Sequence, residues 1–266
     1  MYKAADRKRL HYAGGGAGID AHSGSLALIF VALGVGSFAK GVTGIGLPLF
    51  AVPLLANFIG VERAVVIMVV PSLVANLWLV WAHRRAAPRL AQIRTFLAFG
   101  VLGGLAGTWL LAEASARVLT LMLSLWLGIY LVIMVVKPEF RLRNSRTAAL
   151  PWGFVAGSVQ GATGMSAPVI APFLSGIGLV KEAFVFSIAL AFFLLSVAQI
   201  VAMAHFGLFA PDRVLQGLAA LVPVAIFLPA GIRFARHLST VAFRWFLFGI
   251  LLLLELRLLY DGIWRL

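Results

Sequence analysis

Two short segments of the chain repeat one pattern of residues that could bind an anion. Residues 40–48 read KGVTGIGLP and residues 160–168 read QGATGMSAP, so Gly, Thr, Gly and Pro recur at one constant offset. Glycine lets the backbone turn and approach a ligand closely, and proline fits the first turn of a new helix. A helix start presents free N–H groups and the positive end of the helix dipole, which favour an anion. We expect each segment to end one helix and begin another, so that two helix starts facing each other form an oxyanion site.

The candidate binding residues are the polar and glycine positions of these two segments. They are Lys40, Gly41, Thr43 and Gly44 in the first segment, and Gln160, Gly161, Thr163, Gly164 and Ser166 in the second. The hydroxyl groups of Thr43, Thr163 and Ser166 are candidate caps for the helices that follow.

Lys40 sets the expected sign of the site. It is a cation deep inside an apolar element, where a charge is costly, and we interpret it as a contact for an anionic substrate. Two other roles stay open, because the side chain could extend to the membrane interface or cap the carbonyl groups that end the preceding helix. Its counterpart Gln160 is neutral, so the site would carry one positive charge.

Two amide side chains on the following helices, Asn76 and Gln199, are further candidates for contacting the substrate. The alternative is that each of them hydrogen-bonds a neighbouring helix. Glu62 and Glu182 begin corresponding helices, where a carboxylate interacts favourably with the helix dipole. Their repetition therefore needs no role in proton transfer.

The elements that must hold these residues are membrane helices. Of the 266 residues, 62% are hydrophobic and 12% are charged, and the mean hydropathy is +1.02. Apolar runs of about 18 or more residues predict transmembrane helices, so we expect an all-α polytopic membrane protein. The net charge of +13 gathers in short connections, as the positive-inside rule predicts. We expect lipid and a small anion as partners, and no nucleic acid; a homo-oligomer stays open.

The expected order of elements is the same in the two halves of the chain. Each half begins with a helical element that is broken at the repeated segment, at 25–57 and at 150–176. Each broken element is followed by three spans, at 62–82, 93–112, 117–136, 182–204, 213–232 and 241–262. The expected regions are a disordered tail at 1–24, a first repeat at 25–136, a basic connecting loop at 137–149 and a second repeat at 150–262. A cleaved signal peptide is disfavoured, because no small-residue cleavage site follows the first apolar run.

The orientation of the halves depends on the form of the broken elements. If each is a re-entrant hairpin, each half crosses the membrane three times and the halves are inverted. If each crosses once as two half-helices, the halves are parallel. We favour inverted repeats, because they place the basic loops at 83–94, 137–147 and 233–244 on one side. The parallel arrangement accounts better for the basic N-terminal tail.

Residues 38–46, FAKGVTGIG, and residues 159–168, VQGATGMSAP, resemble the paired signature of the sulfite exporter TauE/SafE-like permeases. The likeness in organisation covers roughly 25–262. The resemblance implies a multi-pass permease of the bacterial plasma membrane. It also implies a small anionic substrate, such as sulfite, sulfoacetate or a sulfonate.

Among function classes we favour a permease, with an anion-selective channel as the alternative. A monovalent anion that leaves a cell with a negative interior gains about 2.3 kcal/mol per 100 mV, which favours efflux, and proton-coupled uptake stays open. No carboxylate sits clearly in the middle of a span, and Glu255 and Arg257 are expected to pair or to reach an interface. An intramembrane enzyme is disfavoured, because the chain lacks H-E-x-x-H and G-x-S-x-G. The pattern implies no cofactor and no metal ligands.

Overall fold

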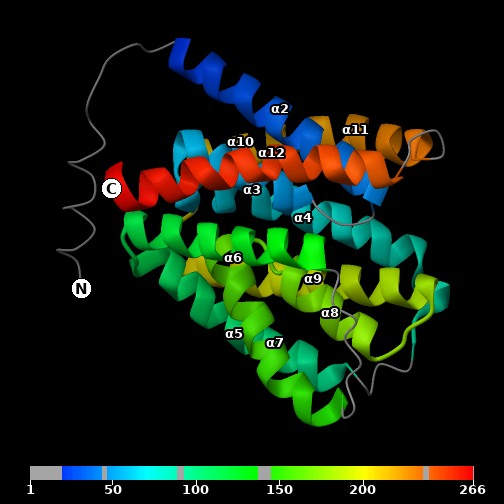
Figure 1. Cartoon of the computed structure of the whole chain (residues 1–266). Helices are drawn as coiled ribbons and strands as arrows, with labels where there is room; N and C mark the ends of the chain where they lie inside the picture. The colour runs from blue at the N-terminus through cyan, green and yellow to red at the C-terminus, as the bar shows by residue number, and fades with distance from the viewer. Residues whose placement is uncertain (1–19, 44–46, 89–92, 137–144, 236–239, 266) are drawn as a thin grey trace.

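The computed structural model describes residues 20–43, 47–88, 93–136, 145–235 and 240–265. Within these ranges the chain is helical and has no β-strand (Figure 1), which confirms the predicted all-α class. Most of the predicted disordered tail lies outside the described residues, but residues 20–24 are the start of a helix. Residues 137–144 of the predicted connecting loop also lie outside the described residues, and its last residues, from Ser145 on, are the start of a helix.

The two halves contain elements in the same order. The first half contains α2 (Asp20–Thr43), α3 (Leu47–Ile59), α4 (Val61–Ala82), the short 3-10 helix η1 (Arg84–Ala86), α5 (Arg94–Glu113) and α6 (Ala116–Val136). The second contains α7 (Ser145–Thr163), α8 (Ala167–Gly176), α9 (Lys181–His205), α10 (Pro211–Ala219), α11 (Leu221–Phe234), α12 (Thr240–Tyr260) and the π-helical turn η3 (Asp261–Arg265).

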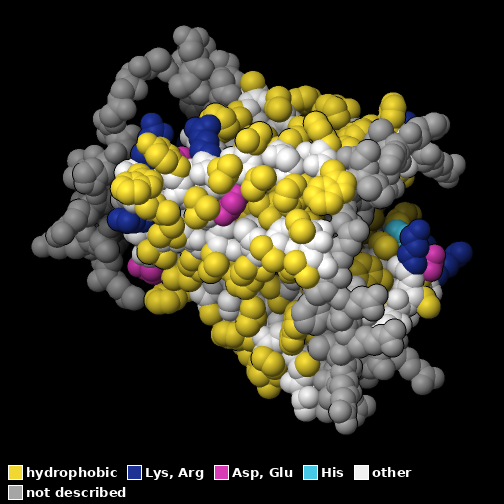
Figure 2. Space-filling model, in the orientation of Figure 1, with side chains coloured by type: hydrophobic (Ala, Val, Ile, Leu, Met, Phe, Trp, Pro, Cys, Tyr) yellow, Lys and Arg dark blue, Asp and Glu magenta, His cyan; other side chains and the backbone are white. Residues whose placement is uncertain are grey.

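Five helices are long and apolar enough to cross a membrane, judged over the described residues. They are α4, α5, α6, α9 and the segment Pro211–Phe234, which joins α10 to α11. The sixth predicted span, α12, has the length but carries three charges, Arg244, Glu255 and Arg257. Figure 2 shows apolar side chains over the visible face, with most charged groups towards its two ends, as a lipid-facing surface requires.

The span predicted at 213–232 is divided between α10 and α11. Ala220 separates the two helices, and Pro223 lies one turn later. A proline ring collides with the carbonyl group four residues earlier, which here belongs to Ala219, the last residue of α10. The division is therefore a local effect of the sequence.

The first broken element folds back on itself. Gly36 of α2 lies against the Leu47 carbonyl oxygen and against Ala51, so α3 runs back along the last turns of α2. At the far end of α3, Gly60 has a φ of 81° and turns the chain into α4. α8 contacts α7 in the second half, and at ten residues it is about 15 Å long. Both observations support the re-entrant form.

Helices from the two halves are paired across the molecule. α5 packs along α7 so closely that a Cβ atom at Gly157 would collide with the Gly100 carbonyl oxygen. Small residues at three- and four-residue spacing allow such an approach. The facing pairs advance in the same direction along both helices, from Phe96–Gly153 through Gly100–Gly157 to Gly104–Gly161. α5 and α7 are therefore parallel.

α2 and α11 form the corresponding pair. Gly34 faces Phe227, and Gly41 faces Gly231 further along both helices, so these two helices are also parallel. In both pairs, a helix that ends at a break packs against a span from the other half.

α10 runs in the same direction as α4. Arg213 bonds Glu62 near the start of both helices, and Gly217 lies against Ile67 further along. By position in the chain, α10 and α11 correspond to α5. As the next span after α4, α5 crosses the membrane in the direction opposite to α4, whereas α10 runs in the same direction as α4. These directions support the inverted arrangement, which stays a prediction.

The buried apolar side chains form two clusters. The first is built mainly from α2, α3, α4, α6, α11 and α12, and the second from α5, α7, α8 and α9. In the second cluster Phe96 stacks on Phe173 at a centroid distance of 4.4 Å. In Figure 1, α2, α11 and α12 of the first cluster lie on one side of the molecule and α5, α7 and α8 of the second lie on the other, with α6 between them.

Candidate functional site

The two helix breaks meet at one small cavity. Its walls contain residues from the first break and from α4, and residues from the second break and from α9. They are Lys40, Pro48, Leu49, Asn76, Gly164, Met165, Ser166, Ala167 and Phe192. Segments more than 100 residues apart in the sequence thus contribute to the same enclosed space, at the boundary between the two apolar clusters.

Lys40 is a buried cation with one neutral partner among the described residues. It lies in the last turn of α2 with 4% of its surface exposed, and its Nζ donates to Asn76 Oδ1 at 2.8 Å. Among the described residues no carboxylate lies within 4.0 Å of the ammonium group. The predicted alternative that Lys40 extends to the interface is wrong, because the side chain is buried. The end of a helix dipole stabilises a cation only partly, so most of this charge stays uncompensated.

Asn76 is held in place by its own helix. Its Nδ2 donates to the Ser72 carbonyl oxygen at 2.8 Å and approaches Ser72 Oγ at 3.3 Å. The amide oxygen is thereby directed at Lys40. Ser72 was not predicted from the sequence, because a serine in an apolar helix gives no specific signal.

The second break contains a connected network of buried neutral groups. Ser166 Oγ donates to Gln160 Oε1 at 2.7 Å, and Gln160 Nε2 approaches Gln199 Oε1 at 3.4 Å. Gln199 Nε2 in turn donates to the backbone carbonyl oxygens of Gln160 at 3.0 Å and Gly161 at 3.2 Å. Gln199 therefore caps the last turn of α7. Gln160 and Gln199 touch the cavity only indirectly, through Ser166.

The predicted capping roles of two hydroxyl groups are wrong. Thr163 Oγ1 donates back to the Val159 carbonyl oxygen at 2.8 Å and accepts from the Met165 N–H at 3.3 Å. It thus closes the end of α7, and it does not cap α8. Ser166 occupies the N-cap position of α8 without a side-chain cap bond, because its hydroxyl is directed to Gln160. The side chain of Thr43 lies outside the described residues.

The glycines of the two breaks have different roles. Gly164 lines the cavity with a φ of 71°, which a residue with a Cβ atom rarely adopts. Gly41 lies against the Leu228 carbonyl oxygen of α11, and Gly161 lies against the Gly104 carbonyl oxygen of α5. These two glycines serve close helix packing and do not line the cavity. Gly44 lies outside the described residues.

The structure brings four of the predicted residues to the cavity wall. They are Lys40, Asn76, Gly164 and Ser166. The apolar wall residues Leu49 and Phe192 were missed, since nothing distinguishes them in sequence from other core positions. Pro48, Met165 and Ala167 were also missed, although they belong to the repeated segments and that pattern could have identified them.

The carboxylates singled out in the sequence lie away from the cavity wall. Glu62 Oε1 accepts from Arg213 Nη1 at 2.7 Å, and Glu182 is exposed in the first turn of α9. The expected pairing of Glu255 with Arg257 is wrong, because Arg257 approaches Asp261 at 3.9 Å and Glu255 accepts from Ser124. In the part of the chain that the structure describes, no three His, Cys, Asp or Glu side chains form a metal-binding group.

This arrangement is suited to binding a small ligand. The cavity offers one ammonium group, one hydroxyl group and the start of α8. In the first turn of α8, Pro168 has no N–H, and Val169 and Ile170 donate to the Ser166 carbonyl oxygen. The Ala167 N–H is therefore the donor of this turn that has no partner among the described residues. Donors of this kind around a single positive charge suit a small oxyanion.

Comparison with known proteins identifies one family. The family model described as "Sulfite exporter TauE/SafE" matches residues 28–258. No curated protein and no solved structure matched the chain.

Proposed function

The chain belongs to the sulfite exporter TauE/SafE family, and we propose that it carries a small sulfite- or sulfonate-type anion across the bacterial plasma membrane. The binding site is the cavity between the two helix breaks. Membership of the family places the chain among membrane transport proteins, and the resemblance noted in the repeated segments agrees with it.

The observation that carries this proposal is the uncompensated charge of Lys40. A buried cation without an ionic partner is costly. The bond to Asn76 Oδ1 leaves two of the three N–H donors of Lys40 without an acceptor among the described residues. The cavity measures about 10 Å³, which is room for about one water molecule, so an anion requires it to widen. A bound anion would then supply both the opposite charge and the missing acceptors. The oxygens of a sulfite or sulfonate group suit the remaining donors of Lys40 and the Ala167 N–H at the start of α8, and Ser166 would join them only if its hydroxyl turned away from Gln160.

The position of the cavity supports a carrier mechanism. In many secondary transporters the substrate site lies where two structural repeats meet, and one body rocks against the other around it. Here Lys40 and Asn76 belong to elements of the first apolar cluster, whereas Ser166 and Phe192 belong to elements of the second. A displacement of one cluster relative to the other would open the cavity, and the membrane potential would favour anion efflux.

Transport measurements on Lys40→Gln test the proposal. Purified protein in liposomes is loaded with sulfite or a sulfonate, and counterflow of labelled substrate is measured. The variant places at position 40 the residue found at its counterpart, Gln160, and removes the charge. We expect its apparent affinity to fall at least about 100-fold, because breaking a buried charge pair costs about 3–5 kcal/mol.

Lys181→Ala is the matched control, since Lys181 is exposed at the start of α9; it should transport normally. Wild-type activity in Lys40→Gln, with folding verified by thermal melting, would remove Lys40 from the site. Saturable counterflow distinguishes a carrier from an anion channel, for which labelled flux would not be stimulated by substrate on the opposite side.

A further inference from the structure

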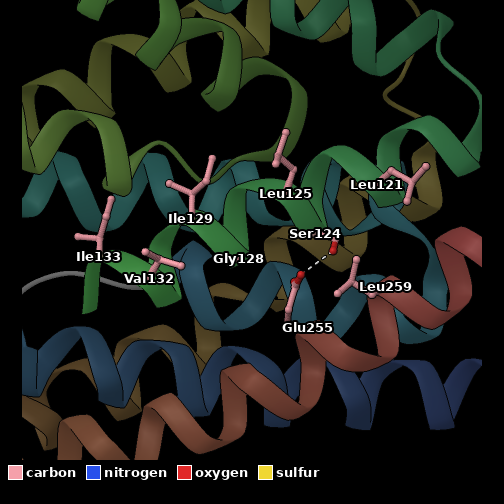
Figure 3. Close-up of a pocket in the computed structure, with 9 residues that line it drawn as sticks. All are labelled: Leu121, Ser124, Leu125, Gly128, Ile129, Val132, Ile133, Glu255 and Leu259. Atoms are coloured by element: carbon pink, nitrogen blue, oxygen red, sulfur yellow. Dashed lines mark hydrogen bonds between the residues drawn. The ribbon is translucent and has the colours of Figure 1, made fainter. Parts of the chain in front are cut away.

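A second feature, a groove between α6 and α12, holds a buried carboxyl group. Figure 3 shows Glu255 of α12 facing Ser124 of α6, and the groove is also lined by Leu125, Ile129 and Val132. Leu125 and Val132 are each 61% exposed, so the groove opens on the apolar outer surface of the molecule. The lining of the groove is otherwise almost entirely apolar.

The carboxyl group of Glu255 is only half satisfied. The residue is 6% exposed, and its Oε1 accepts from Ser124 Oγ at 2.6 Å. Its Oε2 is buried and has no hydrogen-bond partner among the described residues. Gly128 lies beside it, and a Cβ atom there would stand 3.5 Å from Oε1. That distance is an ordinary van der Waals contact, and the buried carboxyl group itself belongs to the lining of the groove.

No positive charge in the described chain balances this carboxyl group. α12 packs against α3, α6 and η3, and α3 contains no ionisable residue. Arg117 of α6 donates to the Ile263 carbonyl oxygen, and Arg257 and Arg265 both approach Asp261. The tyrosines Tyr130 and Tyr260 are the remaining ionisable side chains that the structure describes on these elements, and the side chain of Arg244 in α12 lies outside the described residues. Glu255 therefore has no ion pair with any described residue.

We propose that Glu255 is a proton-binding site reached from the lipid side of the groove. The proton is held on Oε2, while Ser124 donates to Oε1 and fixes the orientation of the group. An ionised carboxylate without a partner in apolar surroundings is far more costly than the neutral acid, so the geometry favours the protonated form. The sequence pattern did not reveal this group, because Ser124 and Glu255 are 131 residues apart. That the proton is exchanged during transport rests on the proposed function.

Carbodiimide labelling tests the site without any transport measurement. A protonated carboxyl group gives its proton to a carbodiimide nitrogen, and its oxygen adds to the central carbon, so the whole reagent is retained as an adduct. In protein-containing liposomes, we expect apolar dicyclohexylcarbodiimide to label Glu255 and a water-soluble carbodiimide to leave it unlabelled. Glu113, an exposed carboxylate at the end of α5, should show the reverse preference.

Peptide mass spectrometry locates the adducts. Glu255→Gln should lose the adduct, and Ser124→Ala should keep it, since Ser124 orients the carboxyl group and does not react. Absence of labelling at Glu255, or equal labelling by both reagents, would overturn the site.

A separate transport experiment tests whether the proton is exchanged. In Glu255→Gln we expect counterflow of sulfite without a pH gradient to persist, and stimulation of flux by a pH gradient to disappear. Stimulation that persists in Glu255→Gln would overturn the coupling role. If wild-type counterflow itself failed, the proposed function would be at fault, while the labelling result would still decide the proton site.

Discussion

At the scale of single residues, the corresponding positions of the two breaks, Lys40 and Gln160, have different hydrogen-bond partners. Gln160 has a hydroxyl donor from Ser166 and an amide neighbour in Gln199, so its polar atoms are used within the protein. Lys40 has one bond to Asn76 and no described carboxylate within ion-pair distance. Two neutral amides can satisfy each other, whereas an ammonium group needs a negative charge. The second break is thus hydrogen-bonded within itself, whereas the first carries a charge that has no described ionic partner.

Asn76→Asp tests this difference. The substitution places a carboxylate where Oδ1 now lies, 2.8 Å from the Lys40 ammonium group. The new carboxylate would form an ion pair with Lys40 and so replace the negative charge of the substrate. We expect the apparent affinity for the anion to fall about tenfold or more, about 1.4 kcal/mol, with little loss of thermal stability. Substrate-dependent shifts in melting temperature measure the affinity.

Asn57→Asp is the control for this prediction, because it makes the same change on α3, where Asn57 bonds Pro53 and Leu254. Unchanged affinity in Asn76→Asp would mean that Lys40 does not contact the substrate.

At the scale of elements, the glycines determine how closely the helices of opposite halves approach. A Cβ atom at Gly153, Gly157 or Gly161 of α7 would collide with backbone atoms of α5. Each collision involves backbone, which cannot move aside as a flexible side chain can. The end of α7 is consequently fixed against α5, and with it the position of the second break.

Gly157→Ala tests the importance of this packing. The new methyl group would meet the Gly100 carbonyl oxygen and the Gly104 amide nitrogen, and such overpacking typically costs about 1–3 kcal/mol. We expect a lower melting temperature in detergent and reduced transport, because the break at 164–167 is displaced.

Gly249→Ala is the matched control, since nothing lies within 4 Å of its added Cβ atom. Alanine is favoured over glycine inside a helix by about 1 kcal/mol, so this variant should be as stable as the wild type or more so. Equal stability of the two variants would contradict the close contact of α5 with α7.

At the scale of the whole molecule, helices of each half pack between and against helices of the other half. α5 packs against α7, α2 packs against α11, and α4 packs against α9. At one end of α4, Glu62 and Arg63 bond Arg213 and Asp212 of α10. These partly exposed ion pairs contribute about 0–1 kcal/mol each, so the apolar helix contacts dominate. Each of the two apolar clusters contains helices from both halves. We therefore expect the clusters, and not the halves, to be the bodies that move relative to each other.

Single-cysteine labelling tests the inverted topology directly, because the natural sequence has no cysteine. Arg85→Cys, Arg233→Cys, Glu113→Cys and His205→Cys each place a thiol at an exposed position of the structure. Inverted halves require positions 85 and 233 to react from one side of the membrane with an impermeant maleimide, and positions 113 and 205 from the other. Parallel halves would instead place 233 with 113, and 205 with 85. Labelling of intact cells and of inverted vesicles separates the two arrangements.

The sequence by itself determined the features that depend on neighbouring residues. Long apolar runs predicted the helical membrane class, and the Gly and Pro pattern located both breaks, because chain length across a bilayer and backbone freedom are local properties. The same kind of rule explains the end of α10 before Pro223, although it was not applied to the sequence. Lys40 stood out because a cation in an apolar segment is costly wherever that segment lies.

Only the tertiary structure decided which groups meet. The sequence did not show that Lys40 would face Asn76, that Gly41 and Gly161 would face neighbouring helices, or that Ser124 would meet Glu255. Such contacts depend on how each helix is rotated about its axis and on which distant helix lies beside it. In a protein whose helices are apolar on most sides, hydrophobic periodicity does not specify that rotation. Packing of glycine surfaces and pairing of the few buried polar groups specify it instead.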